Sequence, residues 1–217
     1  MPLNDLHRRI ATIALRAANR HGFALGGGNA LIAHGLIDRP TQDVDLFTNE
    51  EDGVGAAARS VERALQRAGF AAEREGATAE LADVLEGMGD GLAEWTVTAP
   101  DGQRTMLQLA YFDRAAQPVA MDVGPVLNLE DVVGGKVCAL ASRAEPRDYI
   151  DTAAALAHYD VGQVIAFARR LDPGLEDRDF ADAGRRLDRW GDVIFAPFGL
   201  GPAEVAALRA AFAGWPR

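Results

Sequence analysis

The sequence is poor in cysteine and in long apolar runs, and each shortage excludes a class of protein. A single cysteine, Cys138, cannot close an internal disulfide and has no zinc-type Cys/His spacing around it, so we expect a small buried helix residue. The longest apolar runs are far shorter than the roughly 20 residues that span a bilayer. The opening residues, MPLNDLHRR, lack the apolar core of a secretory signal. We therefore expect a cytoplasmic globular protein with no membrane partner.

Positive charge is also scarce. The 217 residues include 22 basic and 32 acidic side chains, and the net charge of −10 argues against a protein that holds duplex DNA on a broad basic surface. Arginine supplies 21 of the 22 cations, and Lys136 is the only lysine. Either a compact ammonium is needed at that position or the lysine is there by chance. The four histidines stand singly and are expected to be surface or capping residues: His7, His21, His34 and His158.

Hydrophobic spacing and turn residues predict an α/β half followed by a helical half. The spacing predicts helices at 3–21, 29–35 and 55–68, and strands at 23–25, 43–47, 70–75, 95–99, 104–112 and 119–123. After Gly124-Pro125 the pattern is helical, with helices expected at 128–142, 146–159, 161–171, 177–190 and 202–214. The predicted fold class is α/β, a mixed twisted sheet with flanking helices in residues 1–124 and a helical domain in residues 125–217.

Two aspartates stand one residue apart in the expected strand 43–47. Side chains at alternate positions of a strand point to one face, so Asp43 and Asp45 lie about 6 to 7 Å apart along it and can reach one metal cluster. Hard oxygen ligands of this kind suit Mg²⁺, and one or two ions are expected. Alone the pattern is weak, because acidic residues facing solvent on an edge strand are common.

Three consecutive glycines precede the short helix at 29–35. Gly26, Gly27 and Gly28 would let a phosphate approach the backbone N–H groups at the start of that helix. A tight turn that needs positive φ is the other explanation. The short connection to Asp43 and Asp45 favours the first explanation, because the two features together provide both halves of a metal–triphosphate site.

Two blocks of the sequence resemble the polymerase-beta-like nucleotidyltransferases, in particular the AbiEii-type toxin family. The first block is G-G-x-A-L followed by D-x-D-L-F, and here it comprises Gly27, Gly28, Asn29, Ala30, Leu31, Arg39, Thr41 and the strand 43–47. The second is K-x3-A-L-x2-R followed by R-D-x2-D, matched by Lys136, Ala139, Leu140, Arg143, Arg147, Asp148 and Asp151. The resemblance covers most of residues 20–160 and places the only lysine on a motif position.

The resemblance implies a site that binds an NTP together with Mg²⁺. Asp43 and Asp45 would hold the metal and the triphosphate. The phosphate-binding residues would be Gly27, Gly28, Asn29, Arg39, Thr41 and Arg143.

The second block adds cations and acids to this implied site. Lys136 and Arg143 lie on one face of the expected helix 128–142, where they would neutralise phosphate charge, with Lys136 counted among the catalytic residues. Arg147, Asp148 and Asp151 either support the site or brace the helical domain. We expect the site in a cleft between the two halves of the chain.

One position departs from the pattern of the resembled family. Its members place a third carboxylate on a neighbouring strand, and the aligned residue here is Gln108. A glutamine can offer its carbonyl to a metal but cannot act as a general base. Three explanations are open. The enzyme works with two aspartates, or a third group comes from Asp113, Asp122 or another segment. In the third explanation the protein binds a nucleotide and transfers nothing. Asn29 also stands where relatives carry serine or threonine.

The leading functional hypothesis is transfer of NMP from an NTP to a hydroxyl, with release of pyrophosphate. The resemblance implies the 3′ end of a tRNA as acceptor and an antitoxin as partner. RNA would need a local basic strip, for which Arg169-Arg170 and Arg185-Arg186-Arg189 are candidates, although a solvated helix face explains them as well. The alternatives are a small hydroxylated acceptor, as in antibiotic-modifying relatives, a degenerate nucleotide-binding or interaction protein, and a protein in which the glycines and acids are only structural.

Overall fold

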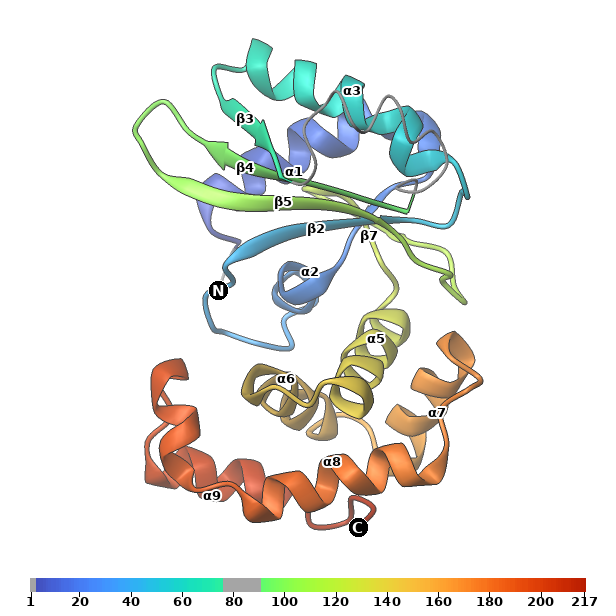
Figure 1. Ribbon diagram of the computed structural model, residues 1–217, viewed down its shortest axis with the longest axis vertical. Helices are drawn as coiled ribbons and strands as arrows, with labels where there is room; N and C mark the ends of the chain where they lie inside the picture. The colour runs from blue at the N-terminus through green and yellow to red at the C-terminus, as the bar shows by residue number, and fades with distance from the viewer. Residues whose placement is uncertain (1–2, 76–90) are drawn as a thin grey trace. The chain divides into compact units, whose positions relative to one another are not determined.

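The computed structural model describes residues 3–75 and 91–217, which group into two compact units. Unit 1 is Met1–Asn128 and unit 2 is Leu129–Arg217, whereas the sequence pattern set the boundary between residues 124 and 125. Unit 1 contains the sheet and unit 2 is helical (Figure 1).

The sheet of unit 1 is mixed, as the sequence predicted. Its described strands are β1 (Ala24–Leu25), β2 (Asp43–Thr48), β3 (Ala71–Arg74), β4 (Leu92–Thr98), β5 (Arg104–Tyr111), β6 (Val119–Met121) and β7 (Gly124–Val126). Their order across the sheet is β3-β4-β5-β2-β1-β7-β6. β2 runs parallel to β5 and β1 runs parallel to β7, whereas the other neighbouring pairs are antiparallel.

Helices cover both faces of this sheet. The helices α1 (Asp5–Ala17) and α3 (Gly53–Arg67) pack on one face, and the short α2 (Gly27–Ala33) lies on the other (Figure 1). The predicted helix 3–21 was wrong at its end. The α-helix stops at Ala17, and a 3-10 turn, η1 (Asn19–His21), follows and closes on Gly22 at φ +60°.

Side-chain alternation decides which face of the sheet each residue occupies. Every second residue of β2, β4 and β5 is buried against the α1 and α3 face: Val44, Leu46, Ala93, Trp95, Val97, Leu107 and Leu109. Burying one such large apolar side chain contributes about 1.5–3 kcal/mol. A slip of one residue would turn this apolar set outward, so burial fixes the register. The residues between them, including Asp43, Asp45, Glu94 and Gln108, therefore lie on the opposite face and are half-buried.

Two strand predictions need correction. β4 begins at Leu92, three residues before the expected start at Trp95, so Glu94 belongs to the sheet. β7 was not predicted, because its sequence Gly-Pro-Val is too short and too rich in turn residues to show a strand period. It pairs in parallel with β1, where Leu25 is opposite Val126.

Unit 2 is helical. Its helices are α5 (Leu129–Ser142), α6 (Pro146–Leu156), α7 (Val161–Leu171), α8 (Asp177–Arg189), the 3-10 helix η2 (Asp192–Phe198) and α9 (Pro202–Ala211). The starts of α6, α7, α8 and α9 are marked by a proline or an acidic capping residue. The Tyr149 ring lies in the core against Trp190 and Phe212, and its hydroxyl donates to the Ala183 carbonyl at 2.8 Å. Within the described residues no single helix is long and apolar enough to cross a membrane. In this part of the chain, only η2 and α9 taken together, as a bent pair, have the length and the apolar composition of a membrane span.

The close packing of α5 on α7 gives a stability prediction for Gly134→Ala. A Cβ at Gly134 would lie 2.8 Å from both the Phe167 carbonyl oxygen and Leu171 Cδ1. We expect the substitution to lower the free energy of unfolding by about 1–3 kcal/mol, because the helices must separate. The matched control is Gly191→Ala, where φ is −75° and the Cβ would meet nothing within 4 Å. Equal urea midpoints for the two variants would contradict the prediction.

Candidate functional site

The three glycines at the start of α2, Gly26, Gly27 and Gly28, are called the glycine turn, and the Asp45 carboxylate lies against this turn. The Gly26 N–H donates to the Asp45 carbonyl oxygen at 2.8 Å. Gly27 has φ +58°, and a Cβ at this position would overlap the Asp45 carboxylate. The turn therefore excludes a side chain at Gly27 for two reasons, its backbone conformation and the acid beside it. The motif residues that the sequence separates by a short loop are neighbours in space.

The loop between α2 and β2 joins the same cluster. A Cβ at Gly28 would lie 2.5 Å from Thr41 Cγ2 and 3.9 Å from Arg39 Nη2. Arg39 is half-buried, and its Nη1 donates to the Pro40 carbonyl at 3.1 Å. The structure thus brings together five of the residues predicted from the first motif block: Gly27, Gly28, Arg39, Thr41 and Asp45.

A buried polar network holds the start of β2 in place. Asn29, only 1% exposed, donates through Nδ2 to the Asp43 carbonyl at 2.7 Å and accepts from the Thr41 hydroxyl at 2.9 Å. Thr105, on β5, donates its hydroxyl to the Gln42 carbonyl at 2.8 Å. The Asn29 side chain is therefore engaged inside the fold, where it positions Asp43 and Thr41. Its predicted role in phosphate binding stays a prediction.

His7 is part of this network, although its isolated position in the sequence predicted a surface or capping residue. The ring is 3% exposed, with Nε2 at 3.0 Å from the Thr105 hydroxyl and Nδ1 at 3.1 Å from the Thr41 hydroxyl. Because the Thr105 proton goes to Gln42, Nε2 of His7 donates to the Thr105 hydroxyl. Burial lowers the pKa of His7, against opposing contributions from the Asn29 hydrogen bond and the Asp43 charge. No spacing rule would have linked His7 to residues so far along the chain.

Three polar side chains form a row across the face of the sheet that α1 and α3 do not cover, called the open face below. Asp45 on β2 is opposite Gln108 on β5, and Gln108 is opposite Glu94 on β4. Residues directly opposite in neighbouring strands point to the same face. The Gln108 amide donates from Nε2 to Glu94 Oε1 at 2.8 Å. Gln108 therefore lies on the strand next to Asp45, as aligned, and Glu94 is a carboxylate that sequence reasoning missed because β4 was started too late.

The two other acids considered as a third carboxylate lie elsewhere in unit 1. Asp113 is exposed and follows the end of β5, five residues beyond Gln108. Asp122 is exposed and lies between β6 and β7, at the other edge of the sheet from β3 and β4. Among the described residues, no group of three or more His, Cys, Asp or Glu side chains is placed to hold a metal ion.

In unit 2, the predicted cations are paired with buried acids. Lys136 Nζ lies 3.0 Å from Asp151 Oδ2, with the lysine side chain 16% and the aspartate side chain 0% exposed. Arg143 makes a two-pronged contact with Asp148, from Nε to Oδ2 and from Nη2 to Oδ1, both at 2.9 Å. These pairs tie α5 to α6, which supports the bracing role left open for the second motif block. The phosphate-binding roles of Lys136 and Arg143 stay predictions.

Several other arginines of unit 2 also make contacts inside it. Arg147 pairs with Glu145 at 2.9 Å. In the proposed basic strip, Arg169 pairs with Asp177, Arg170 with Glu130 and Arg185 with Asp182, while Arg186 donates to the Arg143 carbonyl. Acidic partners thus offset much of the positive charge expected on the strip.

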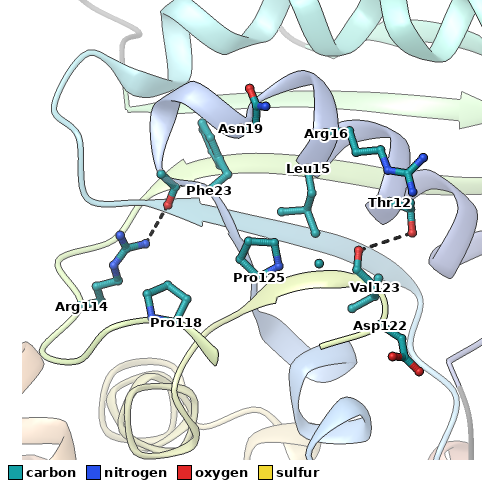
Figure 2. A pocket seen from close by; sticks show the side chains of 12 residues that line it. Thr12, Leu15, Arg16, Asn19, Phe23, Arg114, Pro118, Asp122, Val123 and Pro125 are labelled. Atoms are coloured by element: carbon teal, nitrogen blue, oxygen red, sulfur yellow. Dashed lines mark hydrogen bonds between the residues drawn. The ribbon is translucent and has the colours of Figure 1, made fainter. Parts of the chain in front are cut away.

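A cavity of about 460 Å³ lies elsewhere in unit 1, and Asp122 is the one residue of its lining that was considered for the site (Figure 2). Its lining includes two arginines, Arg16 and Arg114, among apolar side chains. Arg114 Nη1 donates to the Gly22 carbonyl at 2.7 Å, and Thr12 donates to the Val123 carbonyl at 3.4 Å (Figure 2). The open face of the sheet is the better candidate site, because the paired acids, the glycine turn and Gln108 lie there.

Comparison with known proteins shows the family and the fold. The family model described as "Nucleotidyl transferase AbiEii toxin, Type IV TA system" matches residues 10–187. JHP933 from Helicobacter pylori is similar in structure, with 14% identity and a TM-score of 0.58 over 96% of this chain and 91% of that one. MenT4, a nucleotidyltransferase toxin from Mycobacterium tuberculosis H37Rv, has 13% identity and a TM-score of 0.60 over 96% and 82%. At these identities the likeness shows the nucleotidyltransferase fold. No curated protein matches the sequence.

The contact of Gly27 with Asp45 predicts a difference between two alanine substitutions. Gly35 has φ +75°, but a Cβ there would meet nothing within 4 Å, so Gly35→Ala adds only the strain of a left-handed backbone, about 1–2 kcal/mol. We expect Gly27→Ala to cost more, because it adds the same strain and also displaces the Asp45 carboxylate. Urea unfolding of both variants measures the difference. An equal loss of stability in the two would show that Asp45 does not press on the turn.

The burial of His7 predicts a pH-dependent stability. Since its folded pKa lies below the ordinary value of 6.5, the unfolded chain binds more protons, and the free energy of unfolding falls as the pH drops through and below that value. We expect His7→Gln to be less stable than the wild type at pH 7.5 and to lose less stability between pH 7.5 and 5.5. His158→Gln, at an exposed histidine of unit 2, is the control. A His7→Gln variant with the same pH slope as the wild type would refute the assignment.

Proposed function

The chain belongs to the AbiEii nucleotidyltransferase toxin family, and from this premise we propose that it transfers a nucleoside monophosphate from an NTP to a hydroxyl acceptor and releases pyrophosphate. The observation that carries the proposal is the contact between the glycine turn and the Asp45 carboxylate. The contact puts glycine backbone, which a phosphate can approach closely, beside a carboxylate, which can bind the cation of a metal–triphosphate complex.

The donors on the open face fit Mg²⁺. This ion takes one or two protein carboxylates and fills its other positions with water and substrate phosphates. Asp43 and Asp45 are half-buried on one face of β2, and the Gln108 side chain is the neighbour of Asp45 on β5. These three residues would hold one or two ions. When bound, Mg²⁺ would neutralise triphosphate charge and favour loss of the proton from the acceptor hydroxyl.

The chain's own residues would supply positioning and charge in place of a general base. The backbone at Gly27 lies against the Asp45 carboxylate and the backbone at Gly28 against Thr41, with Arg39 close by. Asn29 and His7 keep β2 at a fixed distance from this turn. Holding the reactants in attack geometry can by itself provide a large part of the rate, which makes catalysis compatible with glutamine at position 108.

We propose that Lys136 and Arg143, both in unit 2, bind phosphate oxygens of the NTP. Each is also paired with a fully buried carboxylate. Removing one partner of such a pair costs about 3–5 kcal/mol, because a buried charge is left uncompensated. Loss of activity on replacing either residue therefore identifies a catalytic role only if the free energy of unfolding is measured on the same variant.

The acceptor we propose is a hydroxyl at the 3′ end of a tRNA, with an antitoxin as the partner that the family implies. One observation favours a small hydroxylated molecule as the second candidate. The net charge is −10, and the arginines considered for an RNA-binding strip are largely paired with acids or bonded to carbonyls within unit 2. An RNA would then find little unpaired positive charge on that strip.

The proposed site predicts the behaviour of Asp45→Asn. We expect this change to keep the fold and to reduce NMP transfer by about 10²-fold or more, because it removes a carboxylate that would hold Mg²⁺ at the reacting triphosphate. Asp101→Asn, at an exposed turn between β4 and β5, is the matched control and should keep wild-type transfer. Pyrophosphate release is measured with each NTP and Mg²⁺, with tRNA or total RNA in one series and small polyols in the other.

The outcomes separate the hypotheses. Release that depends on tRNA supports the first acceptor, and release that depends only on a polyol supports the second. Calorimetric binding of an NTP without release under any condition would support a degenerate nucleotide-binding protein. Transfer that survives Asp45→Asn unchanged would refute the site.

A further inference from the structure

Glu94 and Gln108 make a side-chain pair on the open face, next to Asp45. The residues are directly opposite each other in the antiparallel β4–β5 ladder, and Gln108 Nε2 donates to Glu94 Oε1 at 2.8 Å. Both side chains are half-buried. Asp45 is opposite Gln108 on the other side, so Gln108 stands between two carboxylates.

The chemistry of the two groups fixes the orientation of the Gln108 amide. An ionised carboxylate only accepts hydrogen bonds, whereas an amide has a donor end and an acceptor end. The opposite amide orientation would place the Gln108 carbonyl oxygen against a Glu94 oxygen, where the two would repel. The pair with Glu94 therefore selects one orientation, with the NH₂ group at Glu94 and the carbonyl oxygen Oε1 turned away from it.

Distance decides how Glu94 can act on the metal. Neighbouring strands lie about 4.8 Å apart, so the backbones at Asp45 and Glu94 are separated by about 10 Å, with Gln108 between them. Magnesium is held at about 2.1 Å from its oxygen ligands, and Glu94 is already occupied by the amide. Glu94 thus acts through Gln108, as acids beyond the direct ligands commonly do.

We propose that Glu94 is a positioning residue that holds Gln108 with its carbonyl oxygen available to the cation at Asp43 and Asp45. This inference rests on the proposed nucleotidyltransferase function. The missing third carboxylate is then replaced by two residues, a neutral oxygen ligand on β5 and, on β4, a negative charge that orients and polarises it. The negative charge of a three-acid site is kept but moved one strand away.

The test is the Mg²⁺ dependence of NTP binding, measured by calorimetry with a non-hydrolysable NTP analogue, so that no turnover is required. We expect Glu94→Ala and Gln108→Ala each to raise the Mg²⁺ concentration for half-maximal binding about tenfold or more, as loss of an orienting partner does. The double variant should be no weaker than Gln108→Ala, because the two residues act as one unit. Glu73→Ala removes an exposed glutamate of β3 opposite Thr96 and should leave the midpoint unchanged.

An exchange of the two residues provides the rescue. In the variant Glu94→Gln/Gln108→Glu the new amide on β4 can donate to the new carboxylate on β5, which then stands beside Asp45. We expect this double variant to bind at a Mg²⁺ midpoint equal to or below that of the wild type. Gln108→Glu alone places two like charges opposite each other and should lower the free energy of unfolding at neutral pH.

Each result has a defined meaning. An unchanged midpoint in Glu94→Ala overturns the inference, and so does a double alanine variant that loses the product of the two single effects, because Glu94 would then act independently of Gln108. An exchange variant that folds but binds no better than Glu94→Ala also overturns it. If the wild type binds no NTP analogue at any Mg²⁺ concentration, the proposed function itself fails, which is distinct from these outcomes.

Discussion

The burial of alternate residues in β2, β4 and β5 is the constraint on which the rest of unit 1 depends. Leu46, Trp95 and Leu107 have no exposed surface, and the helices α1 and α3 pack on this side of the sheet. Since side chains alternate, the same packing sends Asp45, Glu94 and Gln108 to the other face. The polar row is thus a consequence of apolar burial, because the register that buries the apolar side chains also sets which polar side chains stand opposite one another.

A second set of contacts connects this row to the glycine turn. Gly26 is bonded to the Asp45 backbone, and Asn29 is bonded to the Asp43 backbone, so the start of α2 is held to β2 at two points. His7, in the first helix, closes the arrangement through Thr105 of β5. Three segments that are distant in sequence therefore share one buried network. The network explains how two acids at a strand start can be held rigidly next to a loop.

The sequence predicted the long periodic elements well, because those depend on local spacing. The mixed sheet and the nucleotidyltransferase fold are confirmed. β7 was missed because three residues with a glycine and a proline show no period. Glu94 was missed because the predicted strand began at Trp95. The buried Ala93 continues the alternation of Trp95 and Val97 toward the start of β4, and Glu94 lies between Ala93 and Trp95. The pairing of His7 depends on tertiary contacts alone, which no pattern in a single sequence encodes.

The ion pair of Lys136 with Asp151 has a consequence for how such chains diverge. The ammonium group lies beside a fully buried carboxylate on the next helix, so folding alone gives a reason to retain it. Selection for the fold and selection for catalysis would act on the same side chain. A descendant that had stopped transferring nucleotides would then still carry the lysine and its acid, and the second motif would persist as a record of ancestry after the chemistry had gone.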